Sequence, residues 1–392
     1  MLLRNARTVL TDSTTESTSV LIEDGRIARV FDSSETAPPS SPLIDLNGLT
    51  LFPGFLDIHI HGSASVDTMD TTADGLHKIA VFLRNNGVTA WVPTLVPASA
   101  EGYERAIRAI SDVIDDQKSH LPIPEARILG VHYEGPFVNN QQCGALHREY
   151  FRTFKHISDV DSLPTLSDAE AIHLMTLAPE IDGGIALINE LSKREWIVSI
   201  GHTRATVEVL DQALEAGARH MTHFMNAMTP LHHRAPGPVG WGLMNDQVTC
   251  DLIADGIHLD PSILKLILQN KTSRRVSLIS DAIAAAGLGD GEYQIWGETI
   301  VVENGRTQNT HGSIAGSVIT MIDAARMMLS LGFSESEVAQ MAALNPARLL
   351  KLDHVCGSIE AGKRADLVAL DDERQVRLTI IAGQIAFQDL PS

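Results

Sequence analysis

The sequence predicts an α/β protein, a (β/α)8 TIM barrel that carries a small β-sandwich domain built from both ends of the chain. Apolar runs of strand length alternate with helix-like stretches, as expected for buried parallel strands. Six of these runs end on a histidine, a glutamate or an aspartate, a pattern typical of the rim that carries a barrel's active site. The six runs span residues 56–61, 129–134, 197–202, 221–223, 252–258 and 278–281.

Two further strand-like runs, 89–93 and 172–177, bring the number of predicted barrel strands to eight. Between the strands, helical periodicity predicts helices over 74–86, 100–117, 184–194, 206–216, 261–269, 319–330 and 334–343. Ser334 and Glu337 have the spacing of a capping box at the start of the last of these helices. We therefore expect the barrel domain to span residues 53–350.

The two chain ends are rich in strand signals. The first end predicts strands at 2–10, 19–31 and 43–46, and the last end predicts strands at 366–370, 376–381 and 384–387. Neither end is long enough to bury much surface alone. We expect residues 1–52 and 351–392 to form one small domain together, in preference to two unrelated decorations.

Composition excludes several classes of partner. The 392 residues carry 30 basic and 49 acidic side chains, a formal charge of −19, which argues against a nucleic-acid or anionic-membrane partner. Three widely spaced cysteines do not suggest a disulfide framework or a cysteine-rich zinc site. The first residues show neither a signal peptide nor a membrane span, so the expected location is the cytoplasm.

A divalent metal site is predicted from five strand-end residues. His59 and His61 alternate by two, so both side chains point to the same face of one strand. Glu134 ends another strand, where a buried carboxylate needs a cation; a structural ion pair is the alternative. His202 and His223 end two more strands. Imidazoles and carboxylates without thiolates suit a divalent ion that activates water, which indicates a hydrolase.

Asp281 is the candidate catalytic residue. It ends the eighth predicted strand, and no competing polar group follows it directly. A carboxylate beside an activated water can accept its proton and pass it to a leaving amine. A helix-capping role is the alternative, because aspartate commonly caps helices. By their strand positions, His132 and His220 point away from the rim and are expected to lie behind the metal ligands.

At this point a family resemblance is apparent. Residues 53–62, Pro-Gly-Phe-Leu-Asp-Ile-His-Ile-His-Gly, resemble the first-strand signature of the amidohydrolase superfamily. Further segments resemble, in the same order along the chain, the N-acetylglucosamine-6-phosphate deacetylase family. These segments are 134–137, 201–203, 223–228, 230–237, 255–258, 280–282 and 315–317. The resemblance covers essentially the whole chain.

The resemblance implies a role for each of the strand-end residues. Glu134, His202 and His223 match the metal ligands common to the family, while His59 and His61 match a second metal site that some members lack. One or two divalent ions per subunit are implied, with zinc preferred and iron, cobalt or manganese as alternatives. Asp281 matches the catalytic acid and base. The implied activity is metal-dependent removal of acetate from N-acetylglucosamine 6-phosphate, in amino-sugar catabolism or recycling.

The resemblance also implies a binding site for the sugar phosphate. Asn226 and Ala227 match backbone donors, and His258 matches a side chain, that hold the substrate. Ala315 opens a matching segment and is assigned to the same site. The family commonly has a histidine directly after Gly-Ala that polarises the substrate carbonyl. Here Leu146 intervenes, so His147 stands one residue later and either does this work or leaves the acyl and sugar contacts different.

Arg234 matches an arginine that reaches the phosphate from a neighbouring subunit, which implies a homodimer. On an acidic protein, a lone arginine next to His233 is a plausible local anion site. The following Pro236-Gly237 pair is expected to break helices and to present Arg234 on a stiff, exposed loop.

Three alternatives to this function remain at the level of sequence. The first is a deacetylase of another N-acetyl hexosamine phosphate, such as N-acetylgalactosamine 6-phosphate. The second is a cyclic-amide hydrolase of the dihydroorotase type, which usually needs a lysine that bridges two metals; no strand-end lysine is present. The third is a non-catalytic sugar-phosphate-binding protein, which would have no need of Asp281 as a proton shuttle.

Overall fold

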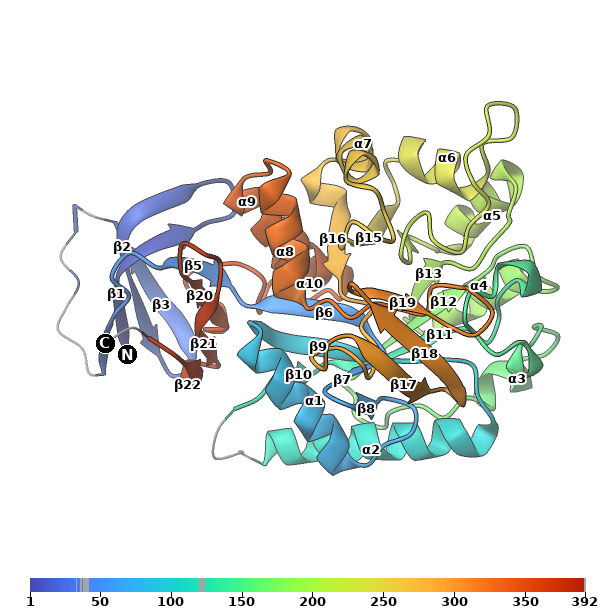
Figure 1. The fold of residues 1–392 in the computed structure, drawn as a ribbon, viewed down its shortest axis with the longest axis horizontal. Coiled ribbons are helices and arrows are strands. Elements are labelled where there is room, and N and C mark those ends of the chain that lie inside the picture. The colour runs from blue at the N-terminus through green and yellow to red at the C-terminus, as the bar shows by residue number, and fades with distance from the viewer. Residues whose placement is uncertain (33, 36, 38–41, 120–123, 391–392) are drawn as a thin grey trace.

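A parallel barrel lies beside a smaller β domain (Figure 1). The computed structural model describes residues 1–392 except 33, 36, 38–41, 120–123 and 391–392. Both chain ends lie in the small domain, at the left of Figure 1, and the barrel occupies the rest of the molecule. Within the described residues, no helix is both long and apolar enough to cross a membrane.

The predicted (β/α)8 barrel is confirmed. Eight parallel strands follow one another around it, and each pairs with the next along the chain. They are β6 (Phe55–Ile60), β9 (Val88–Leu95), β11 (Gly130–Glu134), β12 (Ile172–Leu177), β13 (Ile197–Ile200), β14 (His220–Met221), β15 (Thr249–Ile253) and β16 (Val276–Ile279). A two-residue strand, β10 (Arg127–Ile128), pairs with β9 just before β11. The strands are almost wholly buried, because helices cover the outside and side chains fill the inside.

The first and eighth strands are joined by hydrogen bonds at their carboxyl ends. The backbone N–H of Asp281 donates to the His59 carbonyl at 2.9 Å, and the Ser280 hydroxyl donates to Asp57 Oδ2 at 2.5 Å. Burial raises the pKa of the Asp57 carboxyl to about 7, although the hydrogen bonds from Ser280 oppose this rise. Barrel closure therefore holds the residue before Asp281 directly to the strand that carries His59.

Six of the seven predicted helices are present with ends close to those predicted. They are α1 (Ala73–Asn85), α2 (Ala100–Lys118), α4 (Gly184–Lys193), α5 (Val207–Ala216), α7 (Pro261–Lys271) and α8 (Met321–Ser330). The seventh begins with the predicted capping box of Ser334 and Glu337, but it is divided. A π-helical turn, Gln340–Leu344, separates α9 (Glu335–Ala339) from α10 (Asn345–Leu349). Pro346 has no N–H to donate to the preceding turn, which accounts for the change of helical register.

The expectation that Pro236 and Gly237 break helices is wrong. Helix α6 (Gly237–Met244) begins at this pair. Proline is well tolerated at the start of a helix, where its missing N–H would have no partner within the helix. The helix buries Val239 and Trp241, so packing against the barrel stabilises a segment of low helical propensity. Short helical segments elsewhere are α3 (Ser158–Asp161) and the 3-10 turns Asn140–Gln142, Arg148–Tyr150 and Ser273–Arg275.

Strands from both chain ends form one sheet, as predicted. Its order is β22-β21-β20-β5-β1-β2-β3, and β4 also pairs with β1. The strands are β1 (Leu2–Val9), β2 (Thr14–Glu23), β3 (Arg26–Phe31), β4 (Leu43–Asp45), β5 (Thr50–Pro53), β20 (Leu367–Leu370), β21 (Val376–Ile381) and β22 (Gln384–Gln388). The sheet folds over on itself, so that the turn between β2 and β3 meets the turn between β21 and β22. The backbones of Gly25 and Gly383 come so close there that a Cβ added at Gly383 would lie 2.9 Å from the Gly25 Cα. The domain division at 52/53 and 350/351 stays a prediction.

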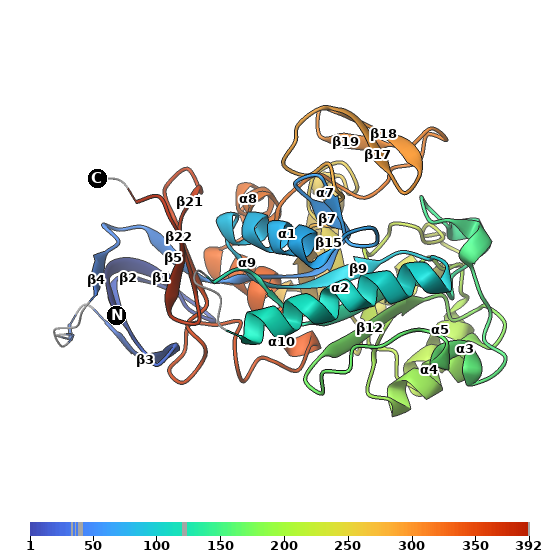
Figure 2. The same ribbon diagram turned by 90° about the horizontal axis from the view of Figure 1, so that it is seen from below.

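A three-stranded antiparallel sheet lies outside the barrel and was not predicted. It consists of β17 (Gly291–Ile295), β18 (Glu298–Glu303) and β19 (Arg306–Gln308), inserted after the eighth barrel strand. Figure 2 shows it standing apart from the helices, near the short hairpin of β7 (Gly62–Ser63) and β8 (Val66–Asp67) that follows β6. This sheet is therefore well placed to border the rim of the barrel.

Glu335 joins the small sheet to the barrel. It lies at the start of α9 and is largely buried, and its Oε1 is 2.5 Å from Arg7 Nη1 and 3.0 Å from Arg374 Nη1. Arg7 belongs to β1, and Arg374 precedes β21, so two cations of the small sheet share one carboxylate. Charge-assisted hydrogen bonds of this kind are roughly twice as strong as neutral ones.

Replacing Glu335 by alanine should lower the free energy of unfolding by about 1–3 kcal/mol, because two half-buried guanidinium groups lose their shared partner. Urea denaturation followed by circular dichroism measures the change. Glu303→Ala, at an exposed position of β18, is the matched control and should change stability by less than about 0.5 kcal/mol. Equal stability of the two variants would show that Glu335 does not hold the domains together.

Candidate metal centre and substrate pocket

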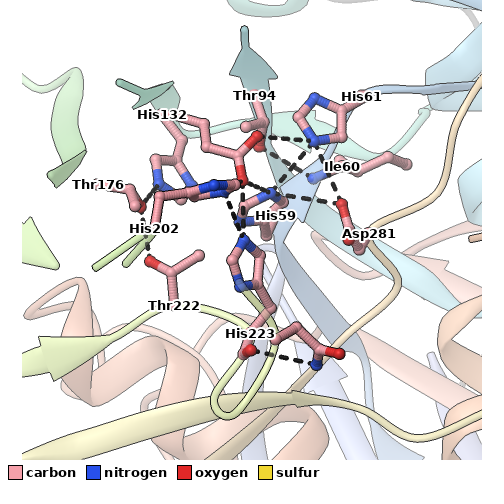
Figure 3. A network of polar contacts seen from close by, with 12 residues as sticks. His59, Ile60, His61, Thr94, His132, Thr176, His202, Thr222, His223 and Asp281 are labelled. Atoms are coloured by element: carbon pink, nitrogen blue, oxygen red, sulfur yellow. Dashed lines mark hydrogen bonds and ion pairs between the residues drawn. The ribbon is translucent and has the colours of Figure 1, made fainter. Parts of the chain in front are cut away.

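The predicted metal ligands and Asp281 lie together at the carboxyl ends of the barrel strands (Figure 3). Each lies within two residues of the carboxyl end of a strand, and each is buried. The strands concerned are β6 for His59 and His61, β11 for Glu134, β13 for His202, β14 for His223 and β16 for Asp281. Alternation along the strand brings His59 and His61 to the same side, as predicted.

The Glu134 carboxylate is the centre of the cluster. Its Oε1 lies 2.9 Å from His202 Nε2 and 2.9 Å from His223 Nε2. Oε1 is also 3.6 Å from His59 Nε2, and Oε2 is 3.3 Å from His61 Nε2. The ligand atoms form two groups that share Glu134, one with His59 and His61 and one with His202 and His223.

The arrangement of nitrogen atoms fits metal binding. The Nε2 atoms of His59 and His61 are 3.2 Å apart, and those of His202 and His223 are also 3.2 Å apart. Four ring nitrogens thus converge on one buried carboxylate. Hydrogen bonds within this cluster cannot use all of their lone pairs, which leaves lone pairs available to a metal ion. Imidazole nitrogen and carboxylate oxygen form a donor set suited to zinc and to other first-row divalent ions.

Burial and charge act in opposite directions on these groups. Burial would raise the pKa of the Glu134 carboxyl, but the charges and hydrogen bonds of the surrounding histidines hold that pKa well below its usual range. Burial lowers the pKa of His59 well below the ordinary value. For His61, burial also acts to lower the pKa, but hydrogen bonds to Asp281 and Glu134 raise it to about 10. The histidines thus hold the Glu134 carboxylate in its charged form.

Three of these residues leave their strands through left-handed backbone conformations. The φ angles are +48° at His202, +31° at His223 and +50° at Asp281. Such conformations cost about 1–3 kcal/mol each for residues other than glycine and cluster at functional sites. They turn the side chains from the strand direction onto the rim of the barrel.

A chain of buried hydrogen bonds supports the ligands from inside the barrel (Figure 3). His132 Nδ1 donates to the Ile58 carbonyl at 3.1 Å, which leaves Nε2 as the acceptor for the Thr176 hydroxyl at 2.7 Å. The His132 ring packs edge-on against the His59 ring, with centroids 4.7 Å apart. His132 thus lies behind the ligands, as predicted.

The loop that carries His223 has a similar anchor. Asp251 on β15 accepts a hydrogen bond from the His223 backbone N–H, and its carbonyl accepts one from Phe224 N–H at 2.9 Å. His220 Nε2 lies 3.0 Å from Asp251 Oδ2. His220 therefore supports the carboxylate that fixes the turn carrying His223, which agrees with its predicted position off the rim.

The cluster opens into a cavity of about 160 Å³, which we call the metal pocket. Asn226, Ala227 and His258, the predicted sugar-phosphate contacts, line it together with Asp281. His258 Nδ1 is held 2.7 Å from Asp255 Oδ2, which fixes the orientation of the ring. The structure therefore brings these residues to the same pocket as the metal ligands.

Three predicted substrate contacts are not brought to the metal pocket by this chain alone. Ala315 is fully buried behind the wall, and its neighbours Ile314 and Gly316 line the pocket instead. His147 Nε2 lies 2.8 Å from the Trp296 carbonyl and lines a neighbouring cavity, because Leu146 takes the place facing the metal pocket. Arg234 is exposed, with Nη1 2.7 Å from His233 Nε2.

Trp296 is a lining residue that the sequence analysis missed. It lies in the turn between β17 and β18, and its ring packs edge-on against His61, with centroids 5.2 Å apart and planes at 86°. A signal was present, because Gly297 follows it between two runs of strand-forming residues. That signal predicts a hairpin but does not place it over the metal site.

Comparisons with known proteins fit this geometry. The model of the amidohydrolase family matches residues 50–386, which include every residue of the cluster. The chain belongs to the amidohydrolase family. Membership makes it a metal-dependent hydrolase that acts on an amide, as predicted, and the predicted resemblance to the N-acetylglucosamine-6-phosphate deacetylases is confirmed.

Two curated relatives of this amidohydrolase differ in the sugar that their names specify. N-acetylgalactosamine-6-phosphate deacetylase of Escherichia coli O157:H7 is 36% identical, and 98% of each chain is covered. N-acetylglucosamine-6-phosphate deacetylase of Bacillus subtilis (strain 168) is 35% identical, with 99% of this chain and 97% of the relative covered.

Two solved structures are similar to this chain over nearly its whole length. N-acetylglucosamine-6-phosphate deacetylase from Thermotoga maritima superposes with a TM-score of 0.87 at 32% identity, covering 99% of this chain and 100% of the other. A variant of N-acetyl-D-glucosamine-6-phosphate deacetylase from Mycobacterium smegmatis, in complex with N-acetyl-D-glucosamine 6-phosphate, gives a TM-score of 0.87 at 31% identity, with 99% of each chain covered.

The two ligand groups that share Glu134 predict up to two metal ions per chain. Replacing His59 and His61 together by alanine should lower the stoichiometry towards one, because Glu134, His202 and His223 remain. His202→Ala and His223→Ala should each lose the ion held by Glu134, His202 and His223, since an incomplete ligand set does not hold it. Elemental analysis of purified protein measures both effects. Unchanged metal content in any of these variants would remove the residue concerned from the ligand set.

Proposed function

We propose that this amidohydrolase removes the acetyl group from N-acetyl-D-glucosamine 6-phosphate, releasing D-glucosamine 6-phosphate and acetate in amino-sugar catabolism or recycling. The observation that carries the proposal is the buried cluster around Glu134, with the Asp281 carboxylate beside it in the metal pocket. The proposal is supported by the similarity of this chain, over nearly its whole length, to proteins named as deacetylases of this substrate.

In this proposal Glu134, His202 and His223 hold one divalent ion, and His59 and His61 complete a second site with Glu134. Zinc is the ion we favour, because three or four nitrogen and oxygen ligands in a compact buried cluster suit it. When bound, such an ion polarises an amide carbonyl and lowers the pKa of water.

Asp281 moves the protons. Its Oδ1 lies 3.2 Å from His61 Nε2 and 3.4 Å from His59 Nε2, so the carboxylate is oriented towards the place where the amide would lie. It accepts a proton from the attacking water at one carboxylate oxygen. It then returns that proton to the amide nitrogen as the C–N bond breaks, so that the amine leaves neutral.

The remaining pocket residues bind the sugar phosphate. Asn226, Ala227 and His258 provide polar groups on the side of the pocket next to His223. We propose that the protein is a homodimer and that Arg234 completes the phosphate site of the partner subunit. An exposed loop position for Arg234 supports this, because the side chain is free to reach another chain. A doubly charged phosphate does not cross membranes unaided, which supports a cytoplasmic location.

The E. coli O157:H7 relative gives the C4 epimer as a second candidate substrate. Its name specifies N-acetylgalactosamine 6-phosphate, and its identity to this chain is as high as that of the relatives named for the glucosamine sugar. Acetate release from both phosphorylated sugars and from their unphosphorylated forms tests the proposal. A higher kcat/KM for the galactosamine sugar would reverse our choice, and no acetate from any of them would exclude a deacetylase.

Asp281→Asn should keep metal and substrate binding while kcat falls by at least about a hundredfold, the usual scale for general acid–base catalysis. Steady-state kinetics and elemental analysis of the same preparation measure the two properties. Asparagine keeps the shape of the side chain but cannot accept the proton. Near-normal turnover would remove Asp281 from the mechanism.

Arg234→Ala should raise KM for the phosphorylated sugar by tens to thousands of fold, because a charge-assisted contact with phosphate contributes about 2–4 kcal/mol when desolvated. Activity on the unphosphorylated sugar should barely change. Arg274→Ala, at another exposed arginine, is the matched control and should leave KM unchanged.

Mixing subunits then tests whether Arg234 acts across an interface. A heterodimer of Arg234→Ala and Asp281→Asn chains contains one site with an intact Asp281 and a donated Arg234. We expect activity to return in verified heterodimers. If it does not, the arginine acts within its own chain or does not contact the phosphate.

A further inference from the structure

A second and larger cavity lies next to the metal pocket. It has a volume of about 670 Å³ and is bordered by residues of the β7–β8 hairpin, the start of α2 and the β17–β18 turn. We call it the side cavity. Among the described residues that line the two cavities, Trp296 alone belongs to both. Trp296 therefore lies between the two cavities, and its ring packs against His61, which lines the metal pocket.

Trp296 is held in an unfavourable backbone conformation. Ile295 pairs with Glu298 across a two-residue hairpin turn, in which φ is +54° at Trp296 and +76° at Gly297. Such turns favour asparagine or glycine at the first position, and a bulky residue in the left-handed region is a genuine outlier. A strained residue at a binding pocket points to a function for its side chain.

His147 holds the turn from the other side. A carbonyl oxygen can only accept, so the contact at 2.8 Å between His147 Nε2 and the Trp296 carbonyl is an N–H donated by histidine. Trp296 also packs in the same apolar cluster as Ala145, two residues before His147. The loop before His147 and the hairpin turn thus form one wall of the metal pocket.

The position of this wall in the pocket indicates which part of a substrate meets it. His223 and His202 contact Glu134 Oε1, whereas His61 contacts Oε2. Asn226 donates to the His223 carbonyl at 3.2 Å, and Trp296 packs against His61. A substrate with its phosphate end at Asn226 and its amide at the ion that Glu134 would hold therefore directs its acyl group towards Trp296.

We propose that Trp296 sets the acyl specificity of the reaction by closing the metal pocket against the side cavity. This inference rests on the proposed function, because it concerns the acyl group of the same substrate. The indole leaves room for an acetyl methyl group and excludes longer chains. Without the indole, the metal pocket and the side cavity become continuous, and a longer acyl chain extends into the larger space.

The test compares N-acetyl-, N-propionyl- and N-butyryl-glucosamine 6-phosphate, with amine release as the measurement. In the wild-type enzyme, kcat/KM should fall by at least about tenfold for each added methylene, the scale found for hydrophobic pockets. In Trp296→Ala the ratio of butyryl to acetyl kcat/KM should rise by at least about tenfold. Trp296→Phe, which keeps an aromatic wall, should lie between the two.

Trp196→Ala is the matched control. It removes an indole that stacks on Tyr133 and His173 and lines neither cavity, so the ratio should stay as in the wild type. An unchanged ratio in a folded Trp296→Ala variant would overturn the proposal. An equal loss of rate for all three acyl groups would overturn it too, because it would assign Trp296 to the positioning of His61.

His147→Ala separates the two roles considered for His147. If it positions the Trp296 turn, the variant should raise the butyryl-to-acetyl ratio, and His147→Gln, which keeps an N–H donor, should restore much of the wild-type ratio. If His147 polarises the substrate carbonyl instead, kcat should fall equally for all acyl lengths, which would contradict the positioning role.

A binding measurement distinguishes failure of this inference from failure of the proposed function. Acetate, butyrate and hexanoate are titrated into the metal-loaded protein and followed by NMR. The wild type should bind acetate at least as well as hexanoate, and Trp296→Ala should prefer hexanoate by about tenfold or more. If no N-acyl sugar phosphate is hydrolysed, the proposed function fails, while this titration still decides whether Trp296 limits chain length.

Discussion

The Glu134 carboxylate is buried among four imidazole nitrogens, and the geometry of the site depends on this contact. A carboxylate taken out of water without partners costs several kcal/mol. Burial acts to raise the pKa of Glu134, and the histidines more than offset that effect. These histidines lie at the carboxyl ends of β6, β13 and β14, and the barrel brings them to one carboxylate that ends β11. The barrel thus brings together the histidines that keep the buried Glu134 carboxylate charged, and that charge in turn depends on the barrel holding the histidines in place.

Closure of the barrel also sets the position of Asp281, the proposed proton-transfer group. Asp281 N donates to the His59 carbonyl, and Ser280 is bound to Asp57 on the same strand as His59. The distance between Asp281 and the histidine pair is thus set by backbone and buried side-chain hydrogen bonds, with little freedom for the loop that follows. A general base has to lie within hydrogen-bond reach of the proton it takes, so this rigidity serves the chemistry directly.

The sequence predicted what depends on local pattern. Strand ends that carry His59, Glu134 or Asp281 are visible because an apolar run and a polar residue adjoin, and the capping box at Ser334 is visible for the same reason. The division of the helix after Ala339 depends on the effect of Pro346 on the preceding turn, and α6 depends on burial of Val239 and Trp241. Neither follows from periodicity alone.

The wall of the pocket could not be predicted for a related reason. The proximity of Trp296 to His61, and the turn of His147 towards the Trp296 carbonyl, arise from segments more than 140 residues apart in the chain. A single extra residue, Leu146, changes which side chain faces the metal pocket. Sequence resemblance carries residue types from a family to this chain, whereas side-chain direction is set by packing between distant loops.

If a protein of charge −19 binds a phosphate, as we propose, it needs donors that do not depend on net charge. In the proposed function these donors lie in the turn after β14. Left-handed residues recur at His223, Met225 and Ala227, with φ of +31°, +76° and +50°. The N–H groups of Phe224 and Asn226 donate to the Asp251 and His223 carbonyls, each at 2.9 Å, so hydrogen bonds within the protein hold this turn in shape. Under the proposed function, one turn carries both the metal ligand His223 and the residues assigned to the phosphate, Asn226 and Ala227, so a few residues of backbone would set the distance between the scissile amide and the phosphate.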